Sequence, residues 1–212
     1  RRPTAIAISN QNLLVHLDAL AARIDLQRGD TLISWLPLGH DMGLVGKALL
    51  SAFSSVDLRL MSPFDFLSRP VAWLKAIASH EGVVTAAPSM AFDILTRRVE
   101  DSVIQGLDLG TWKRAYCGAE PVHVPTLERF IARFEPYGFR AENLKPTYGL
   151  AEATLMVTMP DGGTQGRYLD VGSRTFTIGT RVDVRGEHLL GSGPPEAKDA
   201  ILHACLGPPA EG

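Results

Sequence analysis

Short runs of β-branched and apolar residues alternate with helical segments, and this alternation constrains the fold more than any other feature. Strands are predicted over residues 31–36, 56–61, 83–87, 113–117 and 144–147. Helices are predicted over residues 13–24, capped by Ser9 or Asn10, and over 43–53, 71–80, 89–98 and 124–134. This order predicts an α/β fold in which helices pack on the faces of a mainly parallel sheet. Pro70 is expected at the first helical position of segment 71–80.

The composition changes after residue 159, where glycine, proline and mixed polar residues become frequent. We expect three parts: an α/β core over 1–159, a surface insertion over 160–200 with a small hairpin at 175–184, and a truncated return to the core over 201–212. The chain has no initiator methionine, and both of its ends read as loops. We therefore expect an internal piece of a longer protein.

Charge and hydropathy narrow the class of protein. The formal net charge is -2, which predicts neither a nucleic-acid partner nor a membrane surface. No apolar run reaches the roughly 20 residues that a membrane helix needs, and no signal peptide is visible. The two cysteines, Cys117 and Cys205, lie far apart and are expected to be reduced thiols. These features predict a cytoplasmic protein.

Parallel sheets bind ligands beyond the carboxyl ends of their strands, so the loops over 37–44, 87–91, 118–121 and 148–152 are the candidate site. In the last of them, Tyr148 ends a strand, Gly149 permits a tight turn and Glu152 follows four residues later. A tyrosine ring can stack on a purine, and a carboxylate near phosphates suits Mg²⁺. From spacing alone, a packing tyrosine and an acidic residue at a helix start are the simpler explanation of this pattern.

Two further loops carry candidate residues, each with an ordinary structural explanation beside it. Gly118, Ala119, Glu120 and Pro121 follow a strand, where small residues let the main chain lie against a planar ligand, or simply form a turn. The adjacent residues His40 and Asp41 stand between a strand and a helix start. At this position His40 can bind an anion or act as a base oriented by Asp41. The ordinary structural explanation is that Asp41 caps the helix and that the backbone satisfies His40.

Taken together and in this order, the three loops resemble the adenylate-forming superfamily of acyl-CoA synthetases and fatty-acyl-AMP ligases. The segment 34–44 (SWLPLGHDMGL) is similar to the "SWLPxxHDMGL" segment of the AMP ligases. Segments 60–63, 66–67 and 69–70, then 107–109 and 118–122, match the stretches that follow it. The segment 148–154 (YGLAEAT) carries the resemblance furthest. The likeness covers essentially residues 3–212 and is weakest over 160–200.

The resemblance implies the following roles, with ATP and Mg²⁺ as cofactors and a fatty acid as substrate. Glu152 would hold Mg²⁺ near the phosphates, and His40 would lie near the reacting carboxylate and α-phosphate. The nucleotide would contact Gly118, Ala119, Glu120, Pro121, Tyr148, Gly149, Leu150 and Ala151, with Tyr148 stacked on adenine. The acyl chain would contact Met42, Gly43, Pro88, Ser89, Met90 and Phe92.

Two features are typical of the AMP-ligase branch. Ala151 stands where many members of the superfamily have threonine, and the long segment 160–202 precedes a second motif at 203–209. In that branch the acyl group passes to the phosphopantetheine thiol of an acyl carrier protein or a polyketide synthase. The alternative is an acyl-CoA ligase, in which free CoA accepts the acyl group. The long segment would then be a loop expansion that has no effect on the use of CoA.

Several departures leave another class open. Asn10, Gly39 and Cys117 differ from residues common in the family, which is consistent with a degenerate adenylation module that serves only for docking. The phosphate-gripping loop would precede Pro3, and the ribose-binding aspartate, the hinge and the catalytic lysine would follow Gly212. We therefore expect this chain alone to bind its ligands at most weakly and to turn over negligibly. An unrelated α/β binding domain would require the three loop motifs to coincide by chance.

Overall fold

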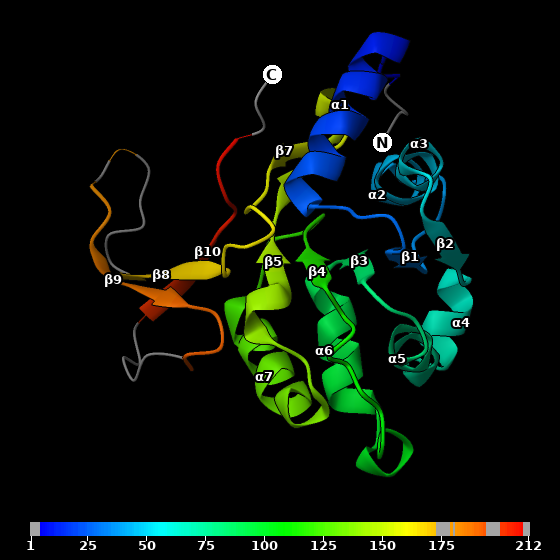
Figure 1. The fold of residues 1–212 in the computed structure, drawn as a ribbon. Helices are drawn as coiled ribbons and strands as arrows, with labels where there is room; N and C mark the ends of the chain where they lie inside the picture. Colours follow the sequence, from blue (N-terminus) through cyan, green and yellow to red (C-terminus); the bar gives the residue numbers. More distant parts are fainter. Residues whose placement is uncertain (1–4, 173–178, 180, 194–199, 210–212) are drawn as a thin grey trace.

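Five parallel strands form the main sheet of the computed structural model, which describes residues 5–172, 179, 181–193 and 200–209 (Figure 1). The strand order is β2-β1-β3-β4-β5, and every pairing in the sheet is parallel. The bounds are Thr31–Ser34 for β1, Asp57–Leu60 for β2, Val83–Ala87 for β3, Arg114–Cys117 for β4 and Leu144–Pro146 for β5. The predicted α/β fold is therefore confirmed.

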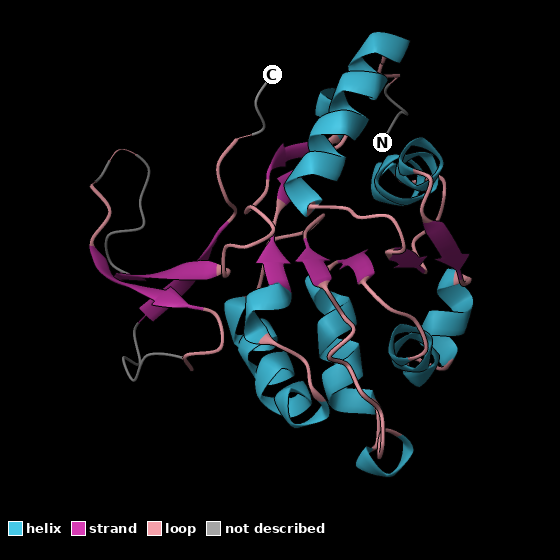
Figure 2. Cartoon of the chain, viewed as in Figure 1, coloured by secondary structure: helices cyan, strands magenta, loops and turns pink. Residues whose placement is uncertain are grey.

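Helices cover both faces of this sheet (Figure 2). Helices α5, α6 and α7 lie on one side, and α1, α2 and α3 lie on the other (Figure 1). The helical bounds are Asn10–Ile24 (α1), Asp41–Gly43 (α2), Leu50–Ser54 (α3), Pro63–Ser68 (α4), Val71–Ala78 (α5), Ser89–Arg98 (α6) and Val124–Phe134 (α7). Short 3₁₀ turns occupy Asp101–Val103 (η2), Glu135–Tyr137 (η3), Ala141–Asn143 (η4) and Ala151–Ala153 (η5).

Helix α1 begins where the sequence predicted a cap. The Ser9 hydroxyl accepts from the Asn12 N–H at 3.1 Å, and the Asn12 side chain accepts from the Ser9 N–H at 3.3 Å. This reciprocal pair satisfies donors that a helix start leaves free. The helix then buries Leu17, Leu20 and Ile24 toward the sheet. Its last two turns thereby form a wall above the strands.

The opposite face of the sheet rests on a buried aromatic cluster. Trp73 of α5 and Trp112 meet edge to face at 5.5 Å, and Phe92 of α6 meets Phe130 of α7 at 5.0 Å. The indole N–H of Trp112 donates to the Thr85 hydroxyl in β3 at 2.9 Å. Each such aromatic pair adds about 0.5–1.5 kcal/mol beyond the area it buries. This face is therefore a well-packed support for the strand ends.

The predicted helix over 43–53 exists but is not uniform. Between α2 and α3 the chain forms a π-helix over Leu44–Leu49 (η1), in which each turn holds an extra residue. Helical periodicity in the sequence does not reveal this widening. The prediction for Pro70 was wrong by one position, because Pro70 is the N-cap residue and Val71 is the first residue of α5.

The last part of the chain adds antiparallel strands. Strand β8 (Arg167–Gly172) pairs with β9 (Val184–Leu189) on one side and with β10 (Ala200–Cys205) on the other, while β6 (Tyr148–Gly149) pairs with β7 (Met156–Thr158). Half of the predicted hairpin at 175–184, namely residues 175–178 and 180, lies outside the described residues. The three-part division at residues 160 and 200 stays a prediction. Among the described helices, none has the length and hydropathy of a bilayer span.

Candidate active site: a pocket at the carboxyl edge of the sheet

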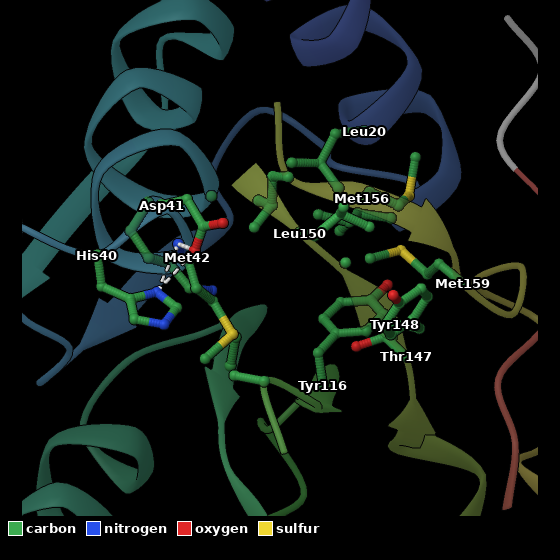
Figure 3. A pocket seen from close by; sticks show the side chains of 17 residues that line it. Leu20, His40, Asp41, Met42, Tyr116, Thr147, Tyr148, Leu150, Met156 and Met159 are labelled. Atoms are coloured by element: carbon green, nitrogen blue, oxygen red, sulfur yellow. Dashed lines mark hydrogen bonds and ion pairs between the residues drawn. The ribbon is translucent and has the colours of Figure 1, made fainter. Parts of the chain in front are cut away.

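A pocket of about 230 Å³ opens where the loops after β1, β4 and β5 come together (Figure 3). Its floor is the face of the sheet that α1 covers, and its walls come from α1, α2, η1 and the β6–β7 hairpin. It is lined by Leu20, Ile24, His40, Asp41, Met42, Gly46, Lys47, Ala86, Tyr116, Ala119, Thr147, Tyr148, Gly149, Leu150, Leu155, Met156 and Met159. This position agrees with the general rule for parallel sheets.

Exposed residues form one side of the pocket. The Tyr148 side chain is 48% exposed, so one face of its ring is free to stack on a planar ligand. Ala119 lies in the left-handed region at φ 67, and Thr154, after the η5 turn, lies there at φ 71. Non-glycine residues in this conformation cost on the order of 1 kcal/mol and gather at functional loops. Both strained positions fall in or beside the predicted nucleotide loops.

The β6–β7 wall is tied to α1 by one histidine. The Met156 N–H donates to Nε2 of His16 at 3.0 Å. Burial lowers the pKa of His16, which favours the neutral ring that can accept this bond. Gly149 sits against the Leu155 backbone so closely that a Cβ atom would collide with it. The hairpin that presents Tyr148 is therefore attached to α1 and tightly packed within itself.

His40 and Asp41 form a pair at the start of α2, as the sequence suggested. His40 Nδ1 lies 2.7 Å from Asp41 Oδ1, and the His40 side chain is 49% exposed (Figure 3). The Met42 N–H donates to Asp41 Oδ1 at 2.7 Å and lies 3.1 Å from His40 Nδ1. His40 Nδ1 can cap the helix only without a proton and can be held by Asp41 only with one, so these two roles of His40 are alternatives, while Asp41 caps the helix in either case.

Two buried polar residues of the pocket were missed by sequence reasoning. Lys47 of η1 is 2% exposed and Tyr116 of β4 is 3% exposed, and both line the cavity. A lone lysine in the otherwise apolar run 42–50 was the signal that could have revealed the first. Tyr116 carries no such signal, because a tyrosine in a buried strand is ordinary.

The profile of the AMP-binding enzyme family matches residues 2–198. The chain belongs to this family. It is 34% identical over 197 residues to a long-chain-fatty-acid–AMP ligase, FadD26, of Mycobacterium marinum, covering 91% of this chain and 34% of the relative. It is 35% identical over 174 residues to the medium-chain-fatty-acid–[acyl-carrier-protein] ligase JamA of Moorena producens, covering 82% and 29%.

The structure of this AMP-binding chain is similar to a solved relative as well. A fatty acyl-adenylate ligase from L. pneumophila, in complex with acyl adenylate and pyrophosphate, superposes with a TM-score of 0.89 at 33% identity. The match covers 99% of this chain and 35% of that protein. The chain thus spans about a third of the length of the relatives it matches.

Other predicted nucleotide and acyl residues of this AMP-binding chain lie beside the pocket without lining it. The Glu120 carboxylate accepts from the Met90 N–H at 2.8 Å at the start of α6. The Ser89 hydroxyl accepts from the His123 N–H at 3.2 Å and lies 3.4 Å from Cys117 Sγ. These bonds join the loops that follow β3 and β4. Other residues outside the lining are Gly43, Pro88, Gly118, Pro121 and Ala151.

Two predicted residues have distinctive positions. Phe92 is fully buried in the aromatic cluster on the α6 side of the sheet, so in this structure it packs the core and does not line the pocket. Glu152 is exposed in the η5 turn, beside Tyr148. Within the described residues no group of three or more His, Cys, Asp or Glu could hold a metal ion. A single exposed carboxylate fits Mg²⁺, which commonly takes one or two carboxylates and completes its shell with phosphates and water.

Proposed function

We propose that this chain forms the adenine- and acyl-binding part of an enzyme that joins a fatty acid to AMP at the expense of ATP. The observation that carries the proposal is the pocket itself. It combines an exposed tyrosine ring at its opening with an apolar wall of Leu20, Ile24, Leu155 and Met156. A nucleotide at the opening and an alkyl chain against that wall would use both features.

In the proposed reaction the fatty carboxylate attacks the α-phosphorus of ATP and pyrophosphate leaves. Negative charge develops on phosphate oxygens, so stabilisation depends on donors and cations rather than on proton transfer. Tyr148 would stack on adenine, with Gly118, Ala119, Glu120 and Pro121 on the other side of the base. His40, held by Asp41, would donate to the reacting groups.

Mg²⁺, when bound, would neutralise phosphate charge. Glu152 would hold it, and Gly149, Leu150 and Ala151 would shape the turn that presents this carboxylate to the nucleotide. Met42 and Gly43 would border the start of the acyl chain, with Pro88, Ser89 and Met90 at the neighbouring strand end. Both curated relatives described above are named as fatty-acid ligases, and the name of FadD26 specifies AMP, which supports this proposal.

We propose a carrier-protein thiol as the acceptor of the acyl group. The ligase JamA, similar over 82% of this chain, is named a fatty-acid–[acyl-carrier-protein] ligase, which supports this choice, whereas FadD21 of Mycobacterium tuberculosis, 40% identical over 77% of this chain, is named a putative fatty-acid–CoA ligase. Incubating the full-length protein with ATP, fatty acid and either a holo carrier protein or CoA separates the two. An acyl-carrier product is expected. A CoA thioester formed in its place would reassign the acceptor.

Calorimetric titration of this chain with a non-hydrolysable acyl-adenylate analogue tests the proposal directly. Saturable binding is expected for the wild type and for Tyr148→Phe, because phenylalanine keeps the stacking face. Tyr148→Ala should weaken binding by roughly tenfold or more, since a base–aromatic stack contributes about 1–3 kcal/mol. Equal affinity of all three would contradict the assigned role of Tyr148, and no binding to any would contradict the proposed function of this chain.

A further inference from the structure

Lys47 is a fully buried cation at the pocket, and its partners are few. It lies on the π-helix η1, a widened turn of the kind that often occurs at functional sites. Its ammonium donates to the Val84 carbonyl of β3 at 3.3 Å, which is a long bond for a charged donor. An ammonium has three donors. One weak bond leaves most of this capacity unused by the described residues.

No carboxylate compensates the charge of Lys47. None of the ion pairs among the described residues includes it, and the pocket's own acid, Asp41, is paired with His40. Burial lowers the pKa of Lys47 to about 7, because no counter-charge among the described residues offsets the desolvation of its ammonium. Buried ammonium groups in proteins are normally paired. A ligand that brings an acceptor or a negative charge to this point would supply the missing partner.

Tyr116 presents a second unsatisfied group at the same cavity. Its hydroxyl is buried and has no hydrogen-bond partner among the described residues. Ala86 of β3 is paired in register with Tyr116 of β4, and Val84 precedes Ala86 by two residues. Since side chains alternate along a strand, Val84 and Ala86 face the same side as Tyr116. The lysine's anchor and the tyrosine therefore lie on adjacent strands of the pocket floor.

The position of these groups separates them from the nucleotide end. The residues expected around the nucleotide and the reacting carboxylate, namely His40, Ala119 and Tyr148, are all exposed at the opening. Lys47 and Tyr116 are buried beneath a wall that is otherwise apolar. A plain alkyl chain would leave both polar groups without partners, and an unmade bond to a buried donor is costly.

We propose that Lys47 and Tyr116 select acyl substrates that carry a second acidic group on the chain, as a dicarboxylic acid does. The inference rests on the proposed function and names its substrate class. The distal carboxylate would accept from the Lys47 ammonium and the Tyr116 hydroxyl while the first carboxylate reacts at the opening. Rejection of plain chains follows from the two groups that they would leave unpaired.

Two length-matched series of non-hydrolysable acyl-adenylate analogues test this, one with plain chains and one with a terminal carboxylate. Calorimetry on this chain should show that, at the best length, the wild type binds the carboxylate analogue at least about tenfold more tightly. Lys47→Met keeps an unbranched side chain without the charge and should reverse this preference. Tyr116→Phe removes one oxygen and should reduce the preference without reversing it.

The outcomes distinguish the two levels of the claim. Tighter binding of plain chains by the wild type at every length would overturn the substrate class and leave the proposed function standing. Equal weakening of both series in Lys47→Met would overturn it too, because it would place the lysine on the shared adenylate. Failure of the wild type to bind either series would overturn the proposed function and this inference with it. The wild-type selectivity decides the matter even where a variant does not fold.

Discussion

Replacing Lys47 with methionine should change how the stability of this fold depends on pH. Burial lowers the pKa of Lys47 from 10.5 to about 7. Between those two values the folded state binds fewer protons than the unfolded state, so the free energy of unfolding of the wild type rises with pH. The lysine destabilises the fold most at and below pH 7, and this penalty fades as the pH approaches the unfolded pKa.

The magnitude follows from the size of the pKa shift. At about 1.4 kcal/mol per unit, the penalty is on the order of 4 kcal/mol at pH 7 and falls to roughly 2 kcal/mol at pH 9. Methionine has a similar unbranched shape but no charge, so Lys47→Met should be free of this slope. The lost bond to Val84 costs about 1–3 kcal/mol at any pH, because it leaves a buried carbonyl without its donor.

Urea unfolding followed by circular dichroism at pH 7 and pH 9 measures the effect. The difference in unfolding free energy, variant minus wild type, should be about 2 kcal/mol larger at pH 7 than at pH 9. Lys75→Met, at an exposed position of α5, is the matched control and should show no such change. A difference that is the same at both pH values would refute the burial of an uncompensated ammonium at Lys47.

Three further changes probe the supports of the pocket. Phe92→Ala should lower the free energy of unfolding by about 3–5 kcal/mol, because Phe92 packs the core. The affinity of the folded variant for an acyl-adenylate analogue should stay unchanged. A selective loss of affinity would return Phe92 to the acyl site. Gly43→Ala should destabilise α2, since the Cβ atom of the new alanine would collide with the Pro37 carbonyl. A variant with wild-type thermal stability would contradict this close approach. Glu128→Ala should lower the free energy of unfolding, measured by chemical denaturation, by about 1–3 kcal/mol. The Glu128 carboxylate accepts from the Gly191 N–H at 2.8 Å and from the Gly193 N–H at 3.1 Å. An unchanged denaturation midpoint would show that these bonds contribute nothing to stability.

The sequence predicted correctly those helices and strands whose limits are set by residues within the element itself. The limits of α7 and β3 match the prediction, because apolar spacing and strand composition define them within the segment itself. The start of α1 followed from one serine and its cap. Strands β8 and β10 were missed, because they are stabilised by pairing between residues distant in the sequence, with Tyr168 opposite Ala204 for example.

The candidate site shows the same division. The spacing of His40 and Tyr148 relative to strand ends placed both at one pocket, since the carboxyl ends of parallel strands meet. The side of α6 on which Phe92 lies could not be read from the sequence, because both faces of that helix carry apolar residues. The burial of Lys47 was not predicted for another reason. The direction of the Lys47 side chain depends on the wide π-turn, which the periodicity of the sequence does not indicate.

The π-turn also determines how the wall of this pocket would respond to the loss of one residue. A π-helix holds one residue more per turn than an α-helix, so deletion of a single residue within Leu44–Leu49 would restore ordinary helical winding. The helical segments on either side would keep their orientation, because the widened turn already accommodates the extra residue. Loss of one residue here would therefore narrow the turn that carries Lys47 while the sheet beneath stays the same. A deletion in this turn would thus reshape the wall of the pocket without any substitution on the pocket floor.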